Sequence, residues 1–376
     1  MKKNALLFVI LLFAIASYGE KKKVEVNGLK FTIDTDTKEA TLEYSEYEGT
    51  TISVPDKINW EGKKYLVTSL GVECLSEYPN LTSVIIPSSV KTISDGCFSH
   101  SDNLITVTLP SSITSLGEGC FDGCLKLKEI TIPPLLTSLP PRCFNQCSNL
   151  KKVVIPKSVT SIGNDCFYLC TELIDVTLSS NLTTLGEGAF QDCEKLKNIT
   201  LPLTLTSIGP TCFKDCKELT SINIPASVTS IGDECFGGCN SLTTFICNAT
   251  TPPKVNFYGF SPFGDINKNC TLYVPKNSVA TYKATPTWKD FAKILAIGDD
   301  PNGIDTPETS QVGIVVREGT VSLLGLNDGE TVTFYTIDGK KIGNVKAVNG
   351  TTTYNVSGNQ MVIAKYGNAK LKILTK

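Results

Sequence analysis

A repeat of 23 residues constrains the fold of this chain more than any other feature of its sequence. A phenylalanine recurs at this interval seven times without a slip in register, and Leu75 holds the same column one unit earlier. Two aliphatic columns keep the same step, one from Leu70 to Ile231 and one from Leu81 to Leu242. Self-similarity at a fixed period of about 20 to 50 residues is the signature of stacked repeats. The phenylalanines are Phe98, Phe121, Phe144, Phe167, Phe190, Phe213 and Phe236.

Each unit contains one recognisable strand. In the pattern Leu-x-x-Ile-x-Ile-Pro the last apolar residues lie two apart, as in a strand, and the proline closes the strand where its missing N–H does least harm. A second extended piece, Val-Thr-Ser-Ile-Gly, follows, and Cys-Phe-x-x-Cys is expected to form a turn of helix or a tight loop. Because one unit cannot bury its apolar face alone, we expect eight units, residues 66–247, to stack into a repeat solenoid with short parallel strands.

The pattern of the units resembles that of a known family. The segment Val159-Thr-Ser-Ile-Gly-Asn-Asp-Cys-Phe-Tyr-Leu-Cys170 is similar to the BspA-like leucine-rich repeats of bacterial surface proteins, in which alanine more often precedes the phenylalanine. Here only Ala189 keeps that alanine, and cysteine takes its place in the other units. The resemblance implies a leucine-rich-repeat fold, a location on the cell surface, and adhesion to host extracellular-matrix proteins or to neighbouring bacteria.

Residues 1–19 have the layout of a secretory signal peptide. Met1-Lys2-Lys3 precedes an apolar run from Ala5 to Ala16, and the small residues Ser17 and Gly19 follow. This is the basic, apolar and small-residue order of such peptides, and the run is shorter than the roughly 20 residues that cross a bilayer. A retained anchor is the alternative. We expect a mature chain without a membrane span, secreted or on the outer cell surface.

Both ends of a solenoid need a cover. Residues 20–65 alternate apolar and polar side chains and include Ile52-Ser-Val-Pro55, a degenerate copy of the strand and its proline, so a β-rich N-terminal cap is expected. Residues 248–297 contain Leu272-Tyr-Val-Pro275 and, further on, Trp288. They resemble the closing segment of the same family, a final strand and a short helix whose aromatic side chains cover the core.

The C-terminal part of the chain changes character. Residues 298–310 are polar and turn-forming and are predicted to be a linker, and residues 311–376 hold short alternating runs that predict a small antiparallel β-sandwich. The segment Phe334-Tyr-Thr-Ile-Asp-Gly-Lys-Lys341, with its Asp-Gly hairpin turn, and the lysine-terminated end resemble the C-terminal sorting domains of the type IX secretion pathway. Gln360-Met-Val replaces the usual Gly-x-Tyr, so an accessory sandwich without a sorting role is the alternative.

The positions of the fifteen cysteines follow the repeat and do not indicate a catalytic or metal site. Thirteen fall in two columns, one directly before the phenylalanine and one three residues after it. Parallel side chains aimed into one core do not face each other, and free cysteine packs as a small apolar residue, so we expect buried free thiols. Cys247 and Cys270 lie outside the columns and are the one pair for which a disulfide stays open.

No catalytic or metal site is predicted. His100 is the only histidine, whereas a zinc site needs four closed ligands and a cysteine nucleophile needs a basic partner. Asp34 and Asp36 lack the glycine and distal glutamate of a calcium loop, so a hairpin turn is the better interpretation. We expect no cofactor and no enzyme activity. The net charge of −2 provides neither a basic field for nucleic acid nor a polybasic patch for anionic membranes.

The predicted working surface is the outward face of the strands. Within each strand, the residues between the inward positions point to solvent and form a regular, rigid array that suits an extended partner at low ordering cost. We expect this face to bind a protein or a glycan. The alternatives are a structural or spacer role in the envelope, and outward threonines that only satisfy strand propensity. The face consists of Ser83, Ile85, Thr106, Thr108, Glu129, Thr131, Lys152, Val154, Asp175, Thr177, Asn198, Thr200, Ser221 and Asn223.

Overall fold

The computed structural model describes residues 20–255, 260–297 and most of 313–374. In the last range the described pieces are 313–317, 320–324, 326, 329–336, 339–348, 351–356, 361–366 and 369–374. The predicted signal peptide and the predicted linker lie outside the described residues.

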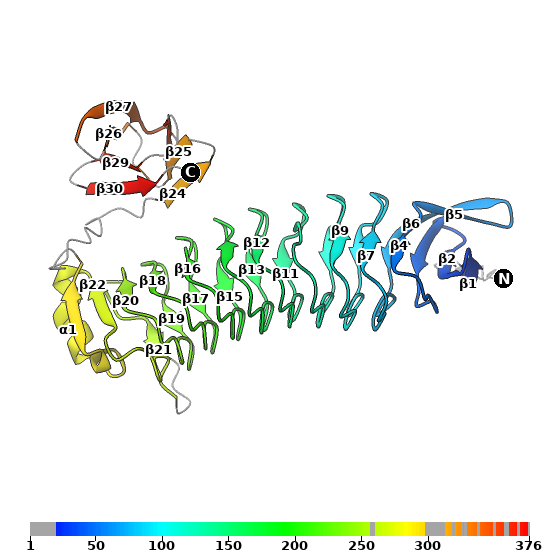
Figure 1. The fold of residues 1–376 in the computed structure, drawn as a ribbon, viewed down its shortest axis with the longest axis horizontal. Coiled ribbons are helices and arrows are strands. Elements are labelled where there is room, and N and C mark those ends of the chain that lie inside the picture. The colour runs from blue at the N-terminus through cyan, green and yellow to red at the C-terminus, as the bar shows by residue number, and fades with distance from the viewer. Residues whose placement is uncertain are drawn as a thin grey trace, which may run out of the picture.

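The central part of the chain is a solenoid whose turns stack side by side along its long axis (Figure 1). Each turn contributes to one or both of two columns of parallel strands, and successive turns pair in register. The predicted repeat solenoid with short parallel strands is confirmed. The first column contains β4 (Thr51–Ser53), β7 (Ser83–Ile85), β9 (Thr106–Thr108), β12 (Lys152–Val154), β14 (Asp175–Thr177), β16 (Asn198–Ile199), β18 (Ser221–Ile224), β20 (Thr244–Cys247), β22 (Thr271–Val274) and β23 (Lys293–Ala296).

The second column is formed by two-residue strands that follow the repeat without interruption. All but the last, β21, lie in the piece of their unit that corresponds to Val-Thr-Ser-Ile-Gly. The column starts from the N-terminal sheet, because β6 (Lys63–Leu70) pairs in parallel with its first strand. The strands are β8 (Thr92–Ile93), β10 (Ser115–Leu116), β11 (Ser138–Leu139), β13 (Ser161–Ile162), β15 (Thr184–Leu185), β17 (Ser207–Ile208), β19 (Ser230–Ile231) and β21 (Lys254–Val255).

A mixed sheet covers the N-terminal end of the solenoid. Its strands pair in the order β1, β2, β3 and β6, with β5 on the other side of β6. The turn between β2 and β3 is closed by Asp34, whose carboxylate accepts the backbone N–H groups of Asp36 and Thr37 at 2.9 and 3.0 Å. The strands are β1 (Lys21–Val26), β2 (Leu29–Asp34), β3 (Glu39–Leu42) and β5 (Lys57–Trp60).

Aromatic side chains close the C-terminal end. A 3₁₀ turn η1 (Lys276–Ser278), helix α1 (Val279–Ala284) and a 3₁₀ turn η2 (Trp288–Asp290) connect β22 to β23. Tyr282 and Trp288 are fully buried, and the Trp288 ring lies edge-on to Phe245 and Phe263 at 6.1 and 4.9 Å between centroids. Strands, a short helix and aromatic side chains therefore cover this end of the core.

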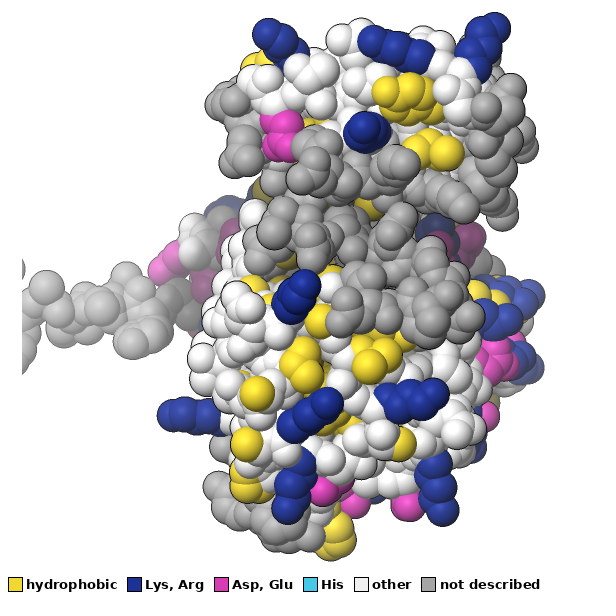
Figure 2. Space-filling view, turned by 90° about the vertical axis from the view of Figure 1, so that its left-hand side faces the viewer, with side chains coloured by type: hydrophobic (Ala, Val, Ile, Leu, Met, Phe, Trp, Pro, Cys, Tyr) yellow, Lys and Arg dark blue, Asp and Glu magenta, His cyan; other side chains and the backbone are white. Residues whose placement is uncertain are grey.

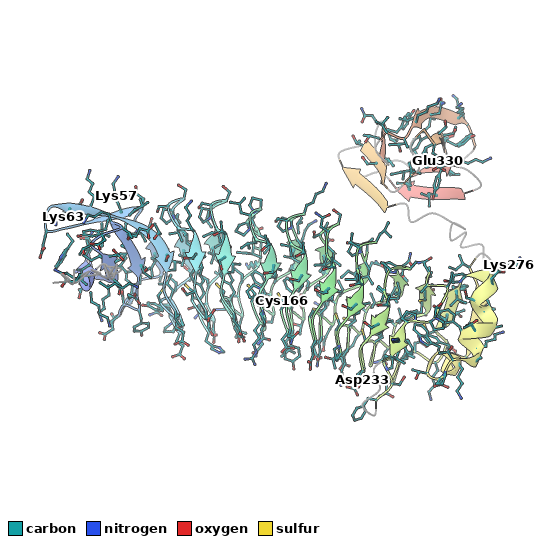
Figure 3. All side chains as sticks on the ribbon, turned by 180° about the vertical axis from the view of Figure 1, so that it is seen from behind. Lys57, Lys63, Cys166, Asp233, Lys276 and Glu330 are labelled. Atoms are coloured by element: carbon teal, nitrogen blue, oxygen red, sulfur yellow. The ribbon has the colours of Figure 1, made fainter. Side chains whose placement is uncertain are left out.

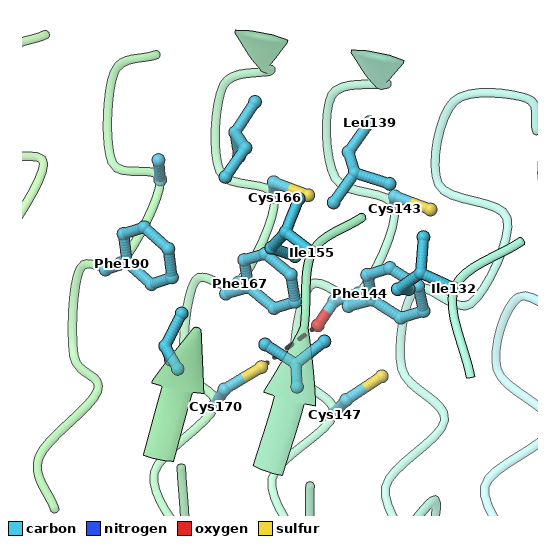
Figure 4. Close-up of a cluster of buried hydrophobic side chains, with 14 of the residues drawn as sticks. Ile132, Leu139, Cys143, Phe144, Cys147, Ile155, Cys166, Phe167, Cys170 and Phe190 are labelled. Atoms are coloured by element: carbon cyan, nitrogen blue, oxygen red, sulfur yellow. Dashed lines mark hydrogen bonds between the residues drawn. The ribbon is translucent and has the colours of Figure 1, made fainter. Parts of the chain in front are cut away.

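The core is one continuous cluster that runs from Val24 to Ile294. At its centre the seven repeat phenylalanines stack nearly parallel, with centroids 4.9 to 5.7 Å apart and planes within 11° (Figure 4). Such offset stacking adds to the free energy of area burial. Because every unit supplies one ring at the same place, each ring is packed from both sides by its neighbours.

The C-terminal part forms two antiparallel sheets around a core of its own, which includes Val332, Phe334 and Val362. One sheet pairs in the order β24, β25, β28 and the other in the order β27, β26, β29, β30. The strands are β24 (Gly313–Arg317), β25 (Thr320–Leu324), β26 (Thr331–Thr336), β27 (Lys341–Lys346), β28 (Thr351–Asn355), β29 (Met361–Tyr366) and β30 (Ala369–Leu374).

Candidate binding surface

The predicted surface faces solvent along the first strand column. Twelve of its fourteen side chains are exposed, and the other two, Ser83 and Ser221, are partly exposed. The residues between them, such as Val153 and Val176, point into the core and are buried. Strand alternation therefore places the predicted residues outward, whereas their role in binding stays a prediction.

The 23-residue period arranges these residues in two rows, and within each sheet strand register places a residue directly beside its counterpart in the next turn. Lys152 pairs with Asp175, which pairs with Asn198, and Val154 pairs with Thr177. The rows are longer than the sequence indicated. Ser221 continues to Thr244, Thr271 and Lys293, and Thr51 and Ser53 of β4 precede Ser83 and Ile85. Parallel pairing thus extends the face at both ends.

The middle of the face carries alternating charge. Glu129 lies beside Lys152 through an isolated parallel backbone β-bridge. The Lys152 ammonium lies 2.6 Å from the Asp175 carboxylate, and both side chains are more than half exposed. An exposed pair of this kind contributes about 0–1 kcal/mol, so the charges are available to a partner at little cost in stability. Ile85 and Val154 add exposed apolar surface, at 55% and 47% exposure.

Threonine hydroxyls differ between the two strand columns. Beside the second column they donate to the backbone carbonyl of the preceding turn, for example Thr183 to Thr160 at 3.0 Å and Thr206 to Thr183 at 3.1 Å. On the first column the hydroxyls of the second row make no hydrogen bond within the described part of the chain. These four are Thr108, Thr131, Thr177 and Thr200. A partner would therefore find unpaired hydroxyl donors at these four threonines and not at the threonines beside the second column.

The cysteines are structural. All fifteen thiols are free and buried, and Cys166 lies inside the coil (Figure 3). In the later column each thiol donates to the carbonyl of the phenylalanine 26 residues earlier, as Cys170 does to Phe144 at 3.2 Å (Figure 4). Burial raises the pKa of the repeat thiols from Cys97 to Cys239, and it raises the pKa of Cys247 to about 11 and that of Cys270 to about 12. Thiols held protonated and away from solvent are poor nucleophiles.

Two other residues considered as chemical candidates have local roles. His100 stands at a left-handed position of its turn, with φ of 55°, beside a shallow depression that Tyr44, Glu73 and Glu77 also line. Two backbone N–H groups lower the pKa of Asp34, as expected for the acceptor of a hairpin turn. No group of three or more potential metal ligands occurs among the described residues.

No helix in the described part of the chain is long and apolar enough to cross a membrane. Two columns of short parallel strands, an unbroken 23-residue period and one aromatic ladder define a leucine-rich-repeat solenoid. The class of protein follows from this geometry alone.

Comparison with known proteins identifies the family. The family model described as "BspA type Leucine rich repeat region" matches residues 68–194 and 160–277, with six copies, which together make up more than half of the chain. The chain belongs to the BspA-type leucine-rich-repeat family. No curated protein matches it.

The chain is also similar to parts of solved structures. A leucine-rich-repeat protein of T. pallidum is 25% identical with a TM-score of 0.48, over 53% of this chain and 91% of that one. A leucine-rich cell surface protein of Faecalibacterium prausnitzii is 20% identical with a TM-score of 0.44, over 77% and 98%. A leucine-rich-repeat protein of Bacteroides ovatus is 18% identical with a TM-score of 0.43, over 75% and 93%.

Proposed function

We propose that this chain is an exported cell-surface protein that binds a protein or glycan through the outward face of its first strand column. The partner is a host extracellular-matrix protein, a bacterial surface protein or a surface glycan, and no enzyme activity, cofactor or nucleic acid is involved. The location is supported by one similar solved structure, which is described as a leucine rich cell surface protein.

The unpaired hydroxyls of Thr108, Thr131, Thr177 and Thr200 carry the proposal. They project from a rigid backbone in register, so a partner can pair with several of them without first ordering a loop. A hydrogen bond of this kind contributes about 0.5–1.5 kcal/mol. The alternating charges of Glu129, Lys152 and Asp175 would set the orientation of the partner.

The test is a binding panel with matched variants. The mature protein is presented to matrix proteins, bacterial surface proteins and a glycan array, and hits are compared with a fourfold Thr→Val variant at 108, 131, 177 and 200. The control is the same change at Thr160, Thr183, Thr206 and Thr229, beside the second column. We expect the first variant to lose about 2 kcal/mol of binding or more, about thirtyfold in affinity, and the control to bind as the wild type does.

The panel also separates the competing functions. Equal loss in both variants would contradict the placement of the site. An absence of binding to every probe would favour a spacer role in the envelope. Turnover of any substrate would contradict both proposals.

For the C-terminal sandwich we propose a role as a sorting domain for type IX export. Its two antiparallel sheets and the segment from Phe334 support this proposal. Deletion of residues 311–376 should keep the chain from reaching the cell surface, as measured by protease accessibility on intact cells. Unchanged surface display would assign the sandwich an accessory role.

A further inference from the structure

Lysines in the repeats and lysines in the C-terminal cap have different surroundings. Five of the ten lysines in residues 66–247 pair with carboxylates of a neighbouring turn, for example Lys195 with Glu172 and Lys217 with Glu194, both at 2.6 Å. These contacts tie one turn to the next. The charge of these five lysines is balanced locally.

The C-terminal cap, residues 248–297, is strongly basic. It contains six lysines but only two acidic residues, Asp265 and Asp290, so its net charge is +4, whereas the whole chain has −2. All six lysines are exposed, and within the described part of the chain none of them forms an ion pair. The lysines are Lys254, Lys268, Lys276, Lys283, Lys289 and Lys293.

Four of these lysines belong to the last layer of the solenoid. Lys276 lies in η1, Lys283 in α1, Lys289 in η2 and Lys293 in β23. Figure 3 labels Lys276 at the C-terminal end of the solenoid. An end-on view shows lysine side chains spread over this face, with hydrophobic side chains between them (Figure 2). We call these four residues the lysine face. Unpaired like charges on one surface attract polyanions over several ångströms.

The apolar residues between the lysines are small. Ala280, Ala284, Pro286 and Ala292 are exposed, and no large hydrophobic side chain is exposed among residues 271–297, which include the lysine face. Phe260, 63% exposed, precedes this range in the cap. A surface that inserts into a membrane presents large apolar groups such as Trp, Phe or Leu beside its basic residues. The lysine face therefore has the charge for an anionic partner without the groups that enter a lipid layer.

We propose that the lysine face binds an acidic polysaccharide, a chain that carries carboxylate or sulfate groups. Lysine ammonium groups on flexible stems can follow repeated charges along such a chain without a fixed geometry. The small residues between them leave the surface open to sugar rings. The lysine face adjoins the strand face at Lys293, the first residue of β23. The other three lysines lie in η1, α1 and η2, away from the threonines of the strand face, so variants of the two surfaces can be compared.

The experiment uses the full mature chain and three variants. In the face variant, Lys276, Lys283, Lys289 and Lys293 become Gln. The control variant makes the same change at four exposed lysines of the N-terminal cap, Lys23, Lys30, Lys63 and Lys64, and so has the same net charge. The third carries the strand-face Thr→Val changes. Circular dichroism and thermal unfolding verify that all are folded, as expected for exposed substitutions.

Binding is measured to heparin, to polygalacturonate, to neutral dextran, and to vesicles of phosphatidylcholine mixed with phosphatidylglycerol. We expect the wild type, the control and the strand-face variant to bind both acidic polysaccharides and not dextran. The face variant should bind at least tenfold more weakly at low salt, and added salt should weaken the binding of the wild type.

Three results would overturn the proposal. The face variant and the control variant could bind alike, which would place the site elsewhere. The vesicles could be bound more tightly than either polysaccharide, which would make the face a lipid site. The wild type could bind neither acidic polysaccharide at low salt, which would leave the lysines without this ligand.

Discussion

Removal of one ring from the aromatic ladder should destabilise the solenoid strongly. Phe167 is fully buried and stacks on Phe144 and Phe190, with centroids 5.3 Å away on both sides. Its replacement by alanine removes both stacking contacts and leaves a cavity that the neighbouring turns cannot fill, because their backbones are fixed by strand pairing. Phe→Ala changes in cores cost about 3–5 kcal/mol. We expect a loss near the upper end, about 4 kcal/mol.

The assay is urea unfolding of the mature chain followed by far-UV circular dichroism. Phe167→Leu is the graded variant, because Leu75 holds the same column in the first unit, and it should cost about 1–2 kcal/mol since the cavity is smaller. Val154→Ala, on the exposed strand face, should change stability by less than about 0.5 kcal/mol. A Phe167→Ala cost below about 1 kcal/mol, or one equal to that of Val154→Ala, would refute the packing argument.

Three further predictions concern the thiols, the turns and the ion pairs. Burial raises the pKa of thiols such as Cys247 and Cys270 in the folded chain, so the thiols of the unfolded chain ionise at lower pH. The free energy of unfolding should therefore fall above about pH 9, by up to about 1.4 kcal/mol per thiol per pH unit. Urea midpoints that do not change from pH 8 to 10 would contradict this. Thr211 has a left-handed φ of 48° at a position where Gly188 stands one turn earlier, so Thr211→Gly should raise stability by about 0.5–1 kcal/mol, and a lower melting temperature would count against that reason. Lys195→Gln should cost about 1 kcal/mol, since the Lys195–Glu172 pair is accessible to solvent, with side chains 44% and 33% exposed. A loss above about 2 kcal/mol in urea unfolding would show that the pair fixes the stacking of turns.

The period of the sequence predicted the part of the fold that repeats. Each unit has the same apolar spacing, so the strand, the core columns and the outward residues from Ser83 to Asn223 followed from one alignment. The strands of the first column beyond these residues did not follow from that alignment, because the distance in sequence between successive strands changes there. The starts of β22 and β23 lie 27 and 22 residues after the preceding strands of the column, so a search at 23 residues does not find them.

The turns left no signal in the sequence. The second residue after each repeat phenylalanine is left-handed in every unit, yet the residue there is Gly123 in one unit, Leu169 in another and Asp215 in a third. Closure of the coil imposes this conformation, and side-chain chemistry does not reveal it. The lysine face was missed for a different reason, since the net charge of the whole chain averages over a basic cap and a more acidic remainder.

The most direct test of the strand face is photo-crosslinking to a partner identified by the binding panel. A photoreactive amino acid is placed at Thr177, on the first strand column, or at Thr183, whose hydroxyl is bonded to the neighbouring turn. Both positions are exposed and lie in successive segments of the same region. We predict a crosslink to the partner from position 177 and none from position 183. A crosslink from 183 alone, or equal yields from both, would contradict binding through the first strand column.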